Sequence, residues 1–163
     1  MHYIGIDPGL TGAIAIVSCL GEFIHLFDMP TITKGKGKGV VKNQVNAAQL
    51  AFLLNPFGGF GVTAVLEQVS TRPGQGIATN GSLMHSLGVT EGVLGALGFP
   101  VIKVAPASWK RHFGLIGAEK DAGRTVAQDR FPGANLARKK DIGRADALLI
   151  ALYGFQKEGR QVA

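Results

Sequence analysis

Hydrophobic residues in the first 28 positions fall into three short runs that are separated by tight turn signals. The runs cover residues 2–7, 12–18 and 22–28, with Pro8-Gly9 and Leu20-Gly21 between them. Short apolar runs bounded by glycine or proline are typical of strands that pair as hairpins. The pattern therefore predicts a three-strand antiparallel meander at the start of the chain.

Beyond residue 30, apolar runs of strand length alternate with longer stretches of helical period. Strands are predicted at 62–67 and 100–104, while the polar, glycine-rich segments 30–43 and 70–81 are expected to be loops. A meander followed by alternating strands and helices predicts an α/β fold, with a mixed five-stranded sheet of three antiparallel and two parallel strands. The helices that flank it are predicted at about 46–54, 82–98, 106–112, 118–130 and 141–156, the first with Asn46 as its N-cap.

The length and composition are those of one globular domain. With 163 residues, 46% of them hydrophobic and 17% charged, the chain can bury a core, and we expect a single domain over residues 1–163. No apolar run reaches about 18 residues and the N-terminus enters a strand directly, so neither a membrane span nor a secretory signal is expected. The single cysteine, Cys19, excludes an internal disulfide and agrees with a cytoplasmic location.

The chain is basic, with a net charge of +6, which favours a polyanionic partner such as nucleic acid. Basic residues lie on both sides of an acidic segment, 141–146, and would draw a phosphate chain toward carboxylates that otherwise repel it. A solvated surface is the alternative explanation for each basic group. The groups are Lys34, Lys36 and Lys38; Lys103, Lys110, Arg111 and His112 around Trp109; and Arg138, Lys139 and Lys140.

Three acids stand at the edges of buried elements. Asp7 ends the first apolar run, Glu67 ends the run 62–67, and Asp146 lies between alanines in the last predicted helix. Taken singly, Asp7 can be a turn residue and Glu67 a solvent-facing strand end, whereas a buried, unpaired Asp146 would be unfavourable. Together they predict a site for Mg²⁺ or Mn²⁺, which prefer oxygen ligands and can promote phosphodiester hydrolysis.

Glycines in the predicted helix 82–98 have a regular spacing. Gly88, Gly92 and Gly95 fall four and three residues apart and share one face. Such a face permits close approach by another backbone, and the sequence leaves open whether that is the sheet or a second subunit. Neither a GxxxxGK[ST] nor a GxGxxG motif is present, so no nucleotide cofactor is expected.

Several segments resemble the RuvC family of Holliday-junction resolvases, in order and over essentially the whole chain. The segments with the acids are Ile4-Gly5-Ile6-Asp7-Pro8-Gly9, Leu66-Glu67-Gln68-Val69 and Gly143-Arg144-Ala145-Asp146-Ala147-Leu148. Further matching blocks are Val104-Ala105-Pro106-Ala107-Ser108-Trp109-Lys110 and Gly117-Ala118-Glu119-Lys120. Two more, Arg72-Pro73-Gly74-Gln75-Gly76 and Ala151-Leu152-Tyr153-Gly154, look most like the shorter phage or prophage members.

The resemblance implies an RNase H-like fold, a homodimer and paired symmetric incisions across a four-way DNA junction, that is, a crossover junction endodeoxyribonuclease. A two-fold dimer supplies one active site to each of the two cleavage points. The resemblance also implies two metal ions per active site and a cytoplasmic location in a bacterial or phage-infected cell. By carry-over, Asp7, Glu67 and Asp146 are the catalytic ligands, Lys110 and Lys120 face the scissile phosphate and backbone, and the loop with Arg72 and Gln75 enters the junction.

The chain departs from the family pattern at the usual fourth metal ligand. Ile142 and Gly143 stand where the family carries His or Asp, and neither can bind a metal. Asp141 lies about 140° from Asp146 around an ideal helix, so it is either a ligand on the preceding turn or a helix N-cap. The full set expected to contact DNA is Arg72, Gln75, Lys34, Lys36, Lys38, Lys110, Arg111, Lys120, Arg138, Lys139 and Lys140.

Three other functions remain open. Loss of the fourth ligand would suit a junction-binding protein with weak or no cleavage. A ribonuclease H acting on RNA–DNA hybrids shares the expected fold. Residues 6–12 also resemble the first phosphate loop of the actin and sugar-kinase superfamily, but those proteins need two such domains around the nucleotide.

Overall fold

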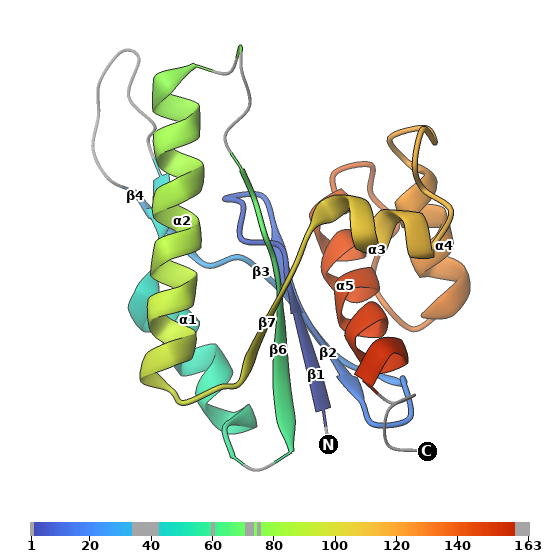
Figure 1. Cartoon of the computed structure of the whole chain (residues 1–163), viewed down its shortest axis with the longest axis horizontal. Coiled ribbons are helices and arrows are strands. Elements are labelled where there is room, and N and C mark those ends of the chain that lie inside the picture. Colours follow the sequence, from blue (N-terminus) through green and yellow to red (C-terminus); the bar gives the residue numbers. More distant parts are fainter. Residues whose placement is uncertain (1, 34–42, 60, 71–73, 75, 159–163) are drawn as a thin grey trace.

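The computed structural model describes residues 2–33, 43–59, 61–70, 74 and 76–158. A five-stranded mixed sheet with the strand order β3-β2-β1-β6-β7 forms its centre (Figure 1). The strands are β1 (His2–Ile6), β2 (Ala13–Ser18), β3 (Phe23–Asp28), β6 (Val62–Glu67) and β7 (Val101–Val104). The first three pair antiparallel, and β6 pairs parallel with both β1 and β7. The predicted sheet is confirmed, with β1 at its centre.

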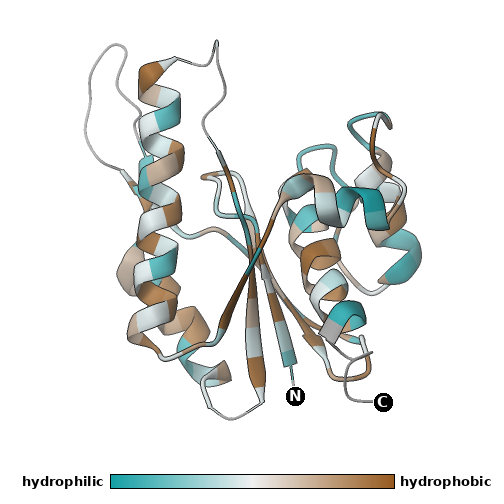
Figure 2. Cartoon of the chain, viewed as in Figure 1, coloured by the Kyte–Doolittle hydropathy of each residue, from teal (hydrophilic) through white to brown (hydrophobic). Residues whose placement is uncertain are grey.

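Helices cover both faces of the sheet. On one side lie α1 (Ala47–Leu54), the short 3₁₀ helix η1 (Asn55–Phe57) and α2 (Ile77–Ala96). On the other lie α3 (Pro106–His112), α4 (Ala122–Arg130) and α5 (Ile142–Glu158), as Figure 1 shows. Figure 2 shows the hydrophobic strands enclosed between the two helical layers.

Alternation along the central strands divides the core into two clusters. Ile4 and Ile6 of β1 pack with Leu50 of α1 and Leu94 of α2, whereas Tyr3 packs with α5 on the opposite face. Successive side chains of a strand point to opposite faces. Because both faces are covered, β1 and β2 are apolar along most of their length rather than alternating, as expected for buried strands.

Helix α5 lies unusually close to the sheet. A Cβ atom built at Gly5 of β1 would overlap the backbone of Ala147 and Ala151 on α5. A Cβ at Gly143 would likewise overlap the carbonyl oxygen of Thr11, in the turn between β1 and β2. Glycine at these positions lets the first half of α5 rest directly on β1 and on this turn.

Several local predictions change. Asn46 does cap α1, with its side chain accepting a hydrogen bond from the backbone N–H of Gln49 at 3.2 Å. However, α2 begins at Ile77 rather than near 82, because its first turn is largely exposed, mixes apolar and polar residues, and carries no hydrophobic period. Similarly, α4 begins at Ala122 rather than near 118.

Part of the segment predicted as a loop is paired. Strands β4 (Thr31–Thr33) and β5 (Asn43–Val45) form a separate two-stranded antiparallel ribbon. Strands of three residues are too short to show a period, so only their mutual pairing reveals them. Among the described helices, none is long and apolar enough to cross a membrane.

The glycine face of α2 points away from the sheet. Gly88, Gly92 and Gly95 are all exposed, and a Cβ at any of them would meet no atom within 4 Å. The alternative in which these glycines pack on the sheet is therefore wrong. The exposed stripe of α2 consists of Gly81, His85, Gly88, Gly92, Gly95 and Ala96.

Candidate active site

The ends of two neighbouring parallel strands bring the first two acids together. Ile6 of β1 is in register with Leu66 of β6, so Asp7 and Glu67, the next residues, leave the sheet at the same edge. Both carboxylates are half-buried. Parallel pairing between strands far apart in sequence thus places the two acids side by side.

Helix α5 adds the third acid. Asp146 immediately precedes Ala147, whose carbonyl faces Gly5 at the centre of β1. Burial, and after it the negative charge of Asp7, raises the pKa of Asp146 from 3.8 to about 7, with a smaller contribution from Glu67. Burial also raises the pKa of Asp7, against the opposing effects of the Gly9 N–H and the Lys110 charge. The charges of Asp7 and Glu67 thus both act on Asp146.

Asp7 is also a turn residue, so the two interpretations of this acid are compatible. Its Oδ1 accepts a hydrogen bond from the Gly9 backbone N–H at 3.1 Å, while its own N–H donates to the Ala13 carbonyl at 3.1 Å. The turn therefore holds the Asp7 side chain by one oxygen.

Glu67 is held by a partner that the sequence did not reveal. The indole Nε1 of Trp109 donates a hydrogen bond to Oε1 of Glu67 at 2.8 Å. Trp109 lies on α3 and is fully buried, and its N–H orients a candidate site carboxylate. The Nζ of the next residue, Lys110, lies 5.2 Å from the centre of the Trp109 ring. The residues 109–110 thus contribute both an orienting donor and a cation.

Two hollows meet at Asp146. The first, of about 360 Å³, is lined by Asp7, Thr11, Lys120, Lys139, Lys140, Ile142, Gly143 and Asp146. The second, of about 250 Å³, lies toward α3 and includes Trp109, Lys110, Lys120, Ile142 and Asp146 in its lining. Four of the predicted DNA-contacting lysines therefore surround the acids, and their charge offsets the carboxylates.

Asp141 has other partners. Its Oδ2 accepts a hydrogen bond from the Arg138 backbone N–H at 2.8 Å, and its Oδ1 lies 2.6 Å from a terminal nitrogen of the Arg138 guanidinium. The Arg138 side chain lowers the pKa of Asp141. Asp141 and Arg138 line a third hollow, of about 300 Å³, beside Asp28. The backbone carbonyl of Asp141 accepts from Ala145, so the residue occupies the N-cap position of α5.

The remaining predicted site residues do not line these hollows. One of them is described, and the others lie outside the described residues. Arg111 is exposed on α3, beside Lys110. Arg72, Gln75, Lys34, Lys36 and Lys38 lie outside the described residues.

The donors suit a hard divalent cation, but they are not preassembled. Carboxylate oxygens are the ligands that Mg²⁺ and Mn²⁺ prefer. Within the described part of the chain, no three His, Cys, Asp or Glu side chains are grouped so that they could hold a metal ion as they stand. Two mutually repelling, half-buried aspartates do make this edge of the sheet favourable for a cation, since a positive charge would relieve their repulsion.

The fold is that of RuvC. Thermus thermophilus RuvC in complex with Holliday junction substrate matches with a TM-score of 0.67 over 98% of this chain and 96% of the other, at 18% sequence identity. A second T. thermophilus RuvC structure matches with a TM-score of 0.58 over 98% and 97% of the two chains, at 19% identity. The expected RNase H-like fold is confirmed.

In sequence, the chain is similar to a Holliday junction resolvase, the chloroplastic MOC1 of Chlamydomonas reinhardtii. The two are 38% identical over an alignment of 152 positions, and the match covers 81% of this chain and 17% of the relative. The resemblance to junction resolvases inferred from the motifs is thereby confirmed, although the chain spans only about a sixth of the length of this relative. No family model matches the chain.

Proposed function

We propose that this protein is a divalent-metal-dependent endonuclease that resolves four-way DNA junctions by paired symmetric incisions. The observation that carries the proposal is the convergence of Asp7, Glu67 and Asp146 at one edge of a RuvC-type sheet, with Lys110 and Lys120 beside them. The similarity to a Holliday junction resolvase supports a junction rather than an RNA–DNA hybrid as substrate.

Asp7, Glu67 and Asp146 would hold the metal. Once bound, a divalent ion activates water and stabilises the leaving oxygen in phosphodiester hydrolysis. The hydrogen bond from the Trp109 indole orients the Glu67 carboxylate. The hydrogen bond from the Gly9 N–H orients the Asp7 carboxylate in the same way. Lys110 lies where it lowers the pKa of both Asp7 and Asp146, and there it can contact a phosphate oxygen.

The DNA backbone would approach over the lysine-lined hollow. Lys120, Lys139 and Lys140 line the same hollow as Asp7 and Asp146. Without these cations the carboxylates would repel a phosphate chain. We also propose backbone contacts for Arg111 and for the expected group outside the described residues, which comprises Lys34, Lys36, Lys38, Arg72 and Gln75.

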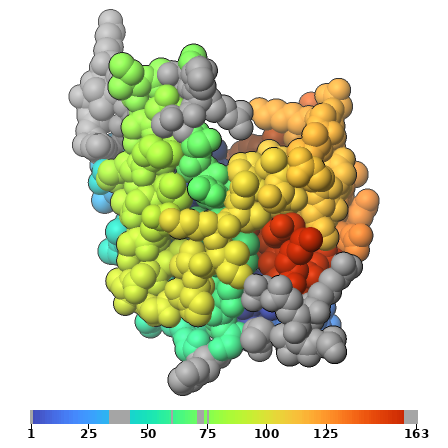
Figure 3. All heavy atoms as spheres, viewed as in Figure 1, coloured from blue at the N-terminus to red at the C-terminus, as the bar shows by residue number. Residues whose placement is uncertain are grey.

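The active form would be a homodimer that meets through α2. The exposed stripe of α2 carries glycine at four of its positions, and α2 lies on the outer surface of the molecule (Figure 3). A helix face without side chains is unfavourable for helix stability in isolation, but it allows close contact with a second copy. Two-fold symmetry would direct one active site to each cleavage point.

We further propose that each active site binds two metal ions. Ile142 lines both hollows beside Asp146, and Asp141 is engaged by Arg138. We therefore expect the second ion to bind more weakly than the first. The same observation favours one alternative function, a protein that binds junctions tightly but cuts them slowly.

The test is cleavage of a labelled four-way junction, a matched duplex and an RNA–DNA hybrid, each with Mg²⁺, Mn²⁺ or EDTA. We expect symmetric paired nicks with 5′-phosphate ends in the junction alone, and none in EDTA. Asp7→Asn and Asp146→Asn should lower the cleavage rate at least about 1,000-fold while the Kd for the junction stays the same or falls, because each removes a negative charge.

Asp129→Asn is the matched control, because Asp129 is an exposed aspartate on α4 and its loss should leave the rate unchanged. Cleavage by Asp146→Asn at the wild-type rate would refute the proposed site. Tight junction binding without nicks under either metal would support the binding alternative, and preferential cutting of the hybrid would identify a ribonuclease H.

A further inference from the structure

The first turn of α5 is tied to the end of β3 by a two-point ion pair. Nε of Arg144 lies 2.5 Å from Oδ1 of Asp28, and a terminal guanidinium nitrogen lies 2.8 Å from Oδ2. The two residues are 116 positions apart in sequence. Such a fork between guanidinium and carboxylate fixes the orientation of both groups as well as their separation.

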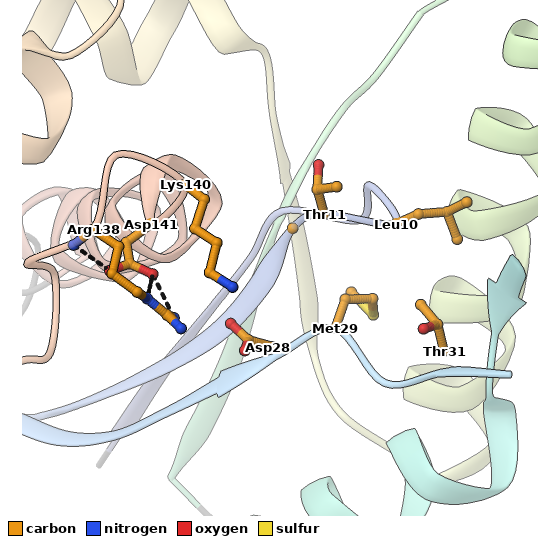
Figure 4. A pocket seen from close by; sticks show the side chains of 9 residues that line it. Leu10, Thr11, Asp28, Met29, Thr31, Arg138, Lys140 and Asp141 are labelled. Atoms are coloured by element: carbon orange, nitrogen blue, oxygen red, sulfur yellow. Dashed lines mark hydrogen bonds and ion pairs between the residues drawn. The ribbon is translucent and has the colours of Figure 1, made fainter.

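The ion pair belongs to a chain of alternating charges around one hollow. Nε of Arg144 is also 3.9 Å from Oδ1 of Asp141, which is paired with Arg138. Figure 4 shows Asp28, Arg138 and Asp141 on one side of this hollow, with the amino end of Lys140 directed toward Asp28. The carboxylates and guanidiniums here neutralise one another, so the cluster has little net charge to attract a phosphate.

This cluster lies across the β1–β2 turn from the candidate active site. Thr11 and Lys140 line both the hollow with Asp28 and the hollow with Asp7 and Asp146. Between them, Gly143 of α5 rests on the Thr11 carbonyl. Arg144 precedes Asp146 by two residues, so the two side chains leave the helix about 200° apart. The ion pair therefore holds one side of the first turn of α5 while Asp146 projects from the other.

The ion pair contributes little to overall stability. The Asp28 side chain is 64% exposed, and exposed ion pairs add little to the free energy of folding. The rest of α5 is held by its buried contacts with β1 and β2. The effect of the fork is thus confined to the orientation of the first turn.

We propose that Asp28 and Arg144 are positioning residues that hold the first turn of α5 so that Asp146 stays beside Asp7 and Glu67 to bind a divalent ion. This inference rests on the proposed function for its metal site. In this proposal neither residue contacts the DNA or the metal, and both act by fixing the position of Asp146.

The test compares Mn²⁺ binding by calorimetry in EDTA-treated, dialysed wild-type protein and in the variants Asp28→Ala, Arg144→Met and Arg144→Lys. Glu91→Ala is the matched control, because Glu91 forms another partly exposed helix-to-strand ion pair, 2.8 Å from Lys103, and its loss changes the charge equally. Thermal unfolding and the junction Kd are measured in parallel.

We expect Asp28→Ala and Arg144→Met to weaken Mn²⁺ binding about tenfold and to lower the cleavage rate by a similar factor. Arg144→Lys keeps the charge but not the fork, and should lie close to Arg144→Met. Glu91→Ala should bind Mn²⁺ as the wild type does. The Tm of all four variants should lie within about 4 °C of the wild type, and the junction Kd of Asp28→Ala should not rise.

Wild-type Mn²⁺ affinity in Asp28→Ala and Arg144→Met would overturn the inference. So would full recovery in Arg144→Lys, which would show that charge suffices. If Arg144→Met raises the Kd for the junction but leaves Mn²⁺ binding unchanged, Arg144 is a DNA contact instead. If the wild type binds Mn²⁺ but cuts no junction, the proposed function fails while the Mn²⁺ comparison still decides the positioning role; if it binds no Mn²⁺, both fail.

Discussion

At the scale of single residues, burial makes the ionised forms of Asp7 and Asp146 unfavourable in the absence of a bound cation. The pKa of Asp146 is raised to about 7, first by burial and then by Asp7. An acid whose pKa is higher in the folded state binds more protons there than in the unfolded state. The contribution of Asp146 to the free energy of unfolding therefore falls as the pH rises from about 4 to about 7, and changes little above that window.

Replacing Asp146 by Asn removes this destabilisation. In metal-free protein, Asp146→Asn should be more stable than the wild type by about 2–4 kcal/mol at pH 8, and the difference should shrink toward pH 5. Urea unfolding followed by circular dichroism at pH 5, 6, 7 and 8 measures it, with Asp129→Asn as the exposed control. Saturating Mn²⁺ should reverse the order at pH 8, because only the wild type retains the ligand. A stability difference that does not vary with pH would contradict this account.

At the scale of elements, the site depends on how closely α5 approaches the sheet. Gly5 faces the backbone of Ala147 and Ala151, and a backbone cannot move aside as a flexible side chain can. At Gly154, by contrast, an added Cβ would meet the Val65 side chain. The closeness of α5 sets where Asp146 lies relative to Asp7.

Replacing Gly5 by alanine should therefore destabilise the fold more than replacing Gly154 by alanine. We expect Gly5→Ala to lower the free energy of unfolding by about 3 kcal/mol or more, and Gly154→Ala by about 1–2 kcal/mol. Gly133→Ala, in an exposed loop where a Cβ meets no atom within 4 Å, is the control and should be near neutral. Denaturant unfolding gives the values. Wild-type stability of Gly5→Ala would show that α5 does not rest directly on β1 at this position.

At the scale of the whole molecule, the proposed dimer would form through the outward-facing surface of α2. The glycines of α2 face outward, so close packing against the sheet is not the reason that these positions carry glycine. A junction resolvase must cut two symmetric points before the junction rearranges, which a two-fold dimer achieves by holding both sites at once.

A charge on this surface should separate the subunits. Gly92→Glu should shift the mass measured by light scattering from a dimer toward the 17.1 kDa monomer, because a carboxylate would be buried against its own copy. Junctions with a single nick should then accumulate during cleavage. Gly133→Glu carries the same change on an exposed loop and should remain dimeric. A dimer that survives Gly92→Glu would place the interface elsewhere.

Much of the fold could be predicted from local patterns. The apolar runs of β1, β2, β3 and β6, and the periods of α1, α3 and α5, lie within a few residues of where the sequence predicts them. The acids could be recognised because each ends or interrupts such a run. The start of α2 and the β4–β5 ribbon could not, since their exposed or very short segments show no hydrophobic period.

The sequence by itself determined most of the elements, the antiparallel meander and the three candidate acids, because hydrophobic period and turn residues act between near neighbours in the chain. The order of the strands in the sheet came from the tertiary structure. The tertiary structure alone decided which partners orient those acids. Trp109 reaches Glu67 across 42 positions and Arg144 reaches Asp28 across 116. Asp141 lies near Asp146 in sequence, yet Arg138 engages its carboxylate. Such pairings depend on how the elements pack, and no local period records them.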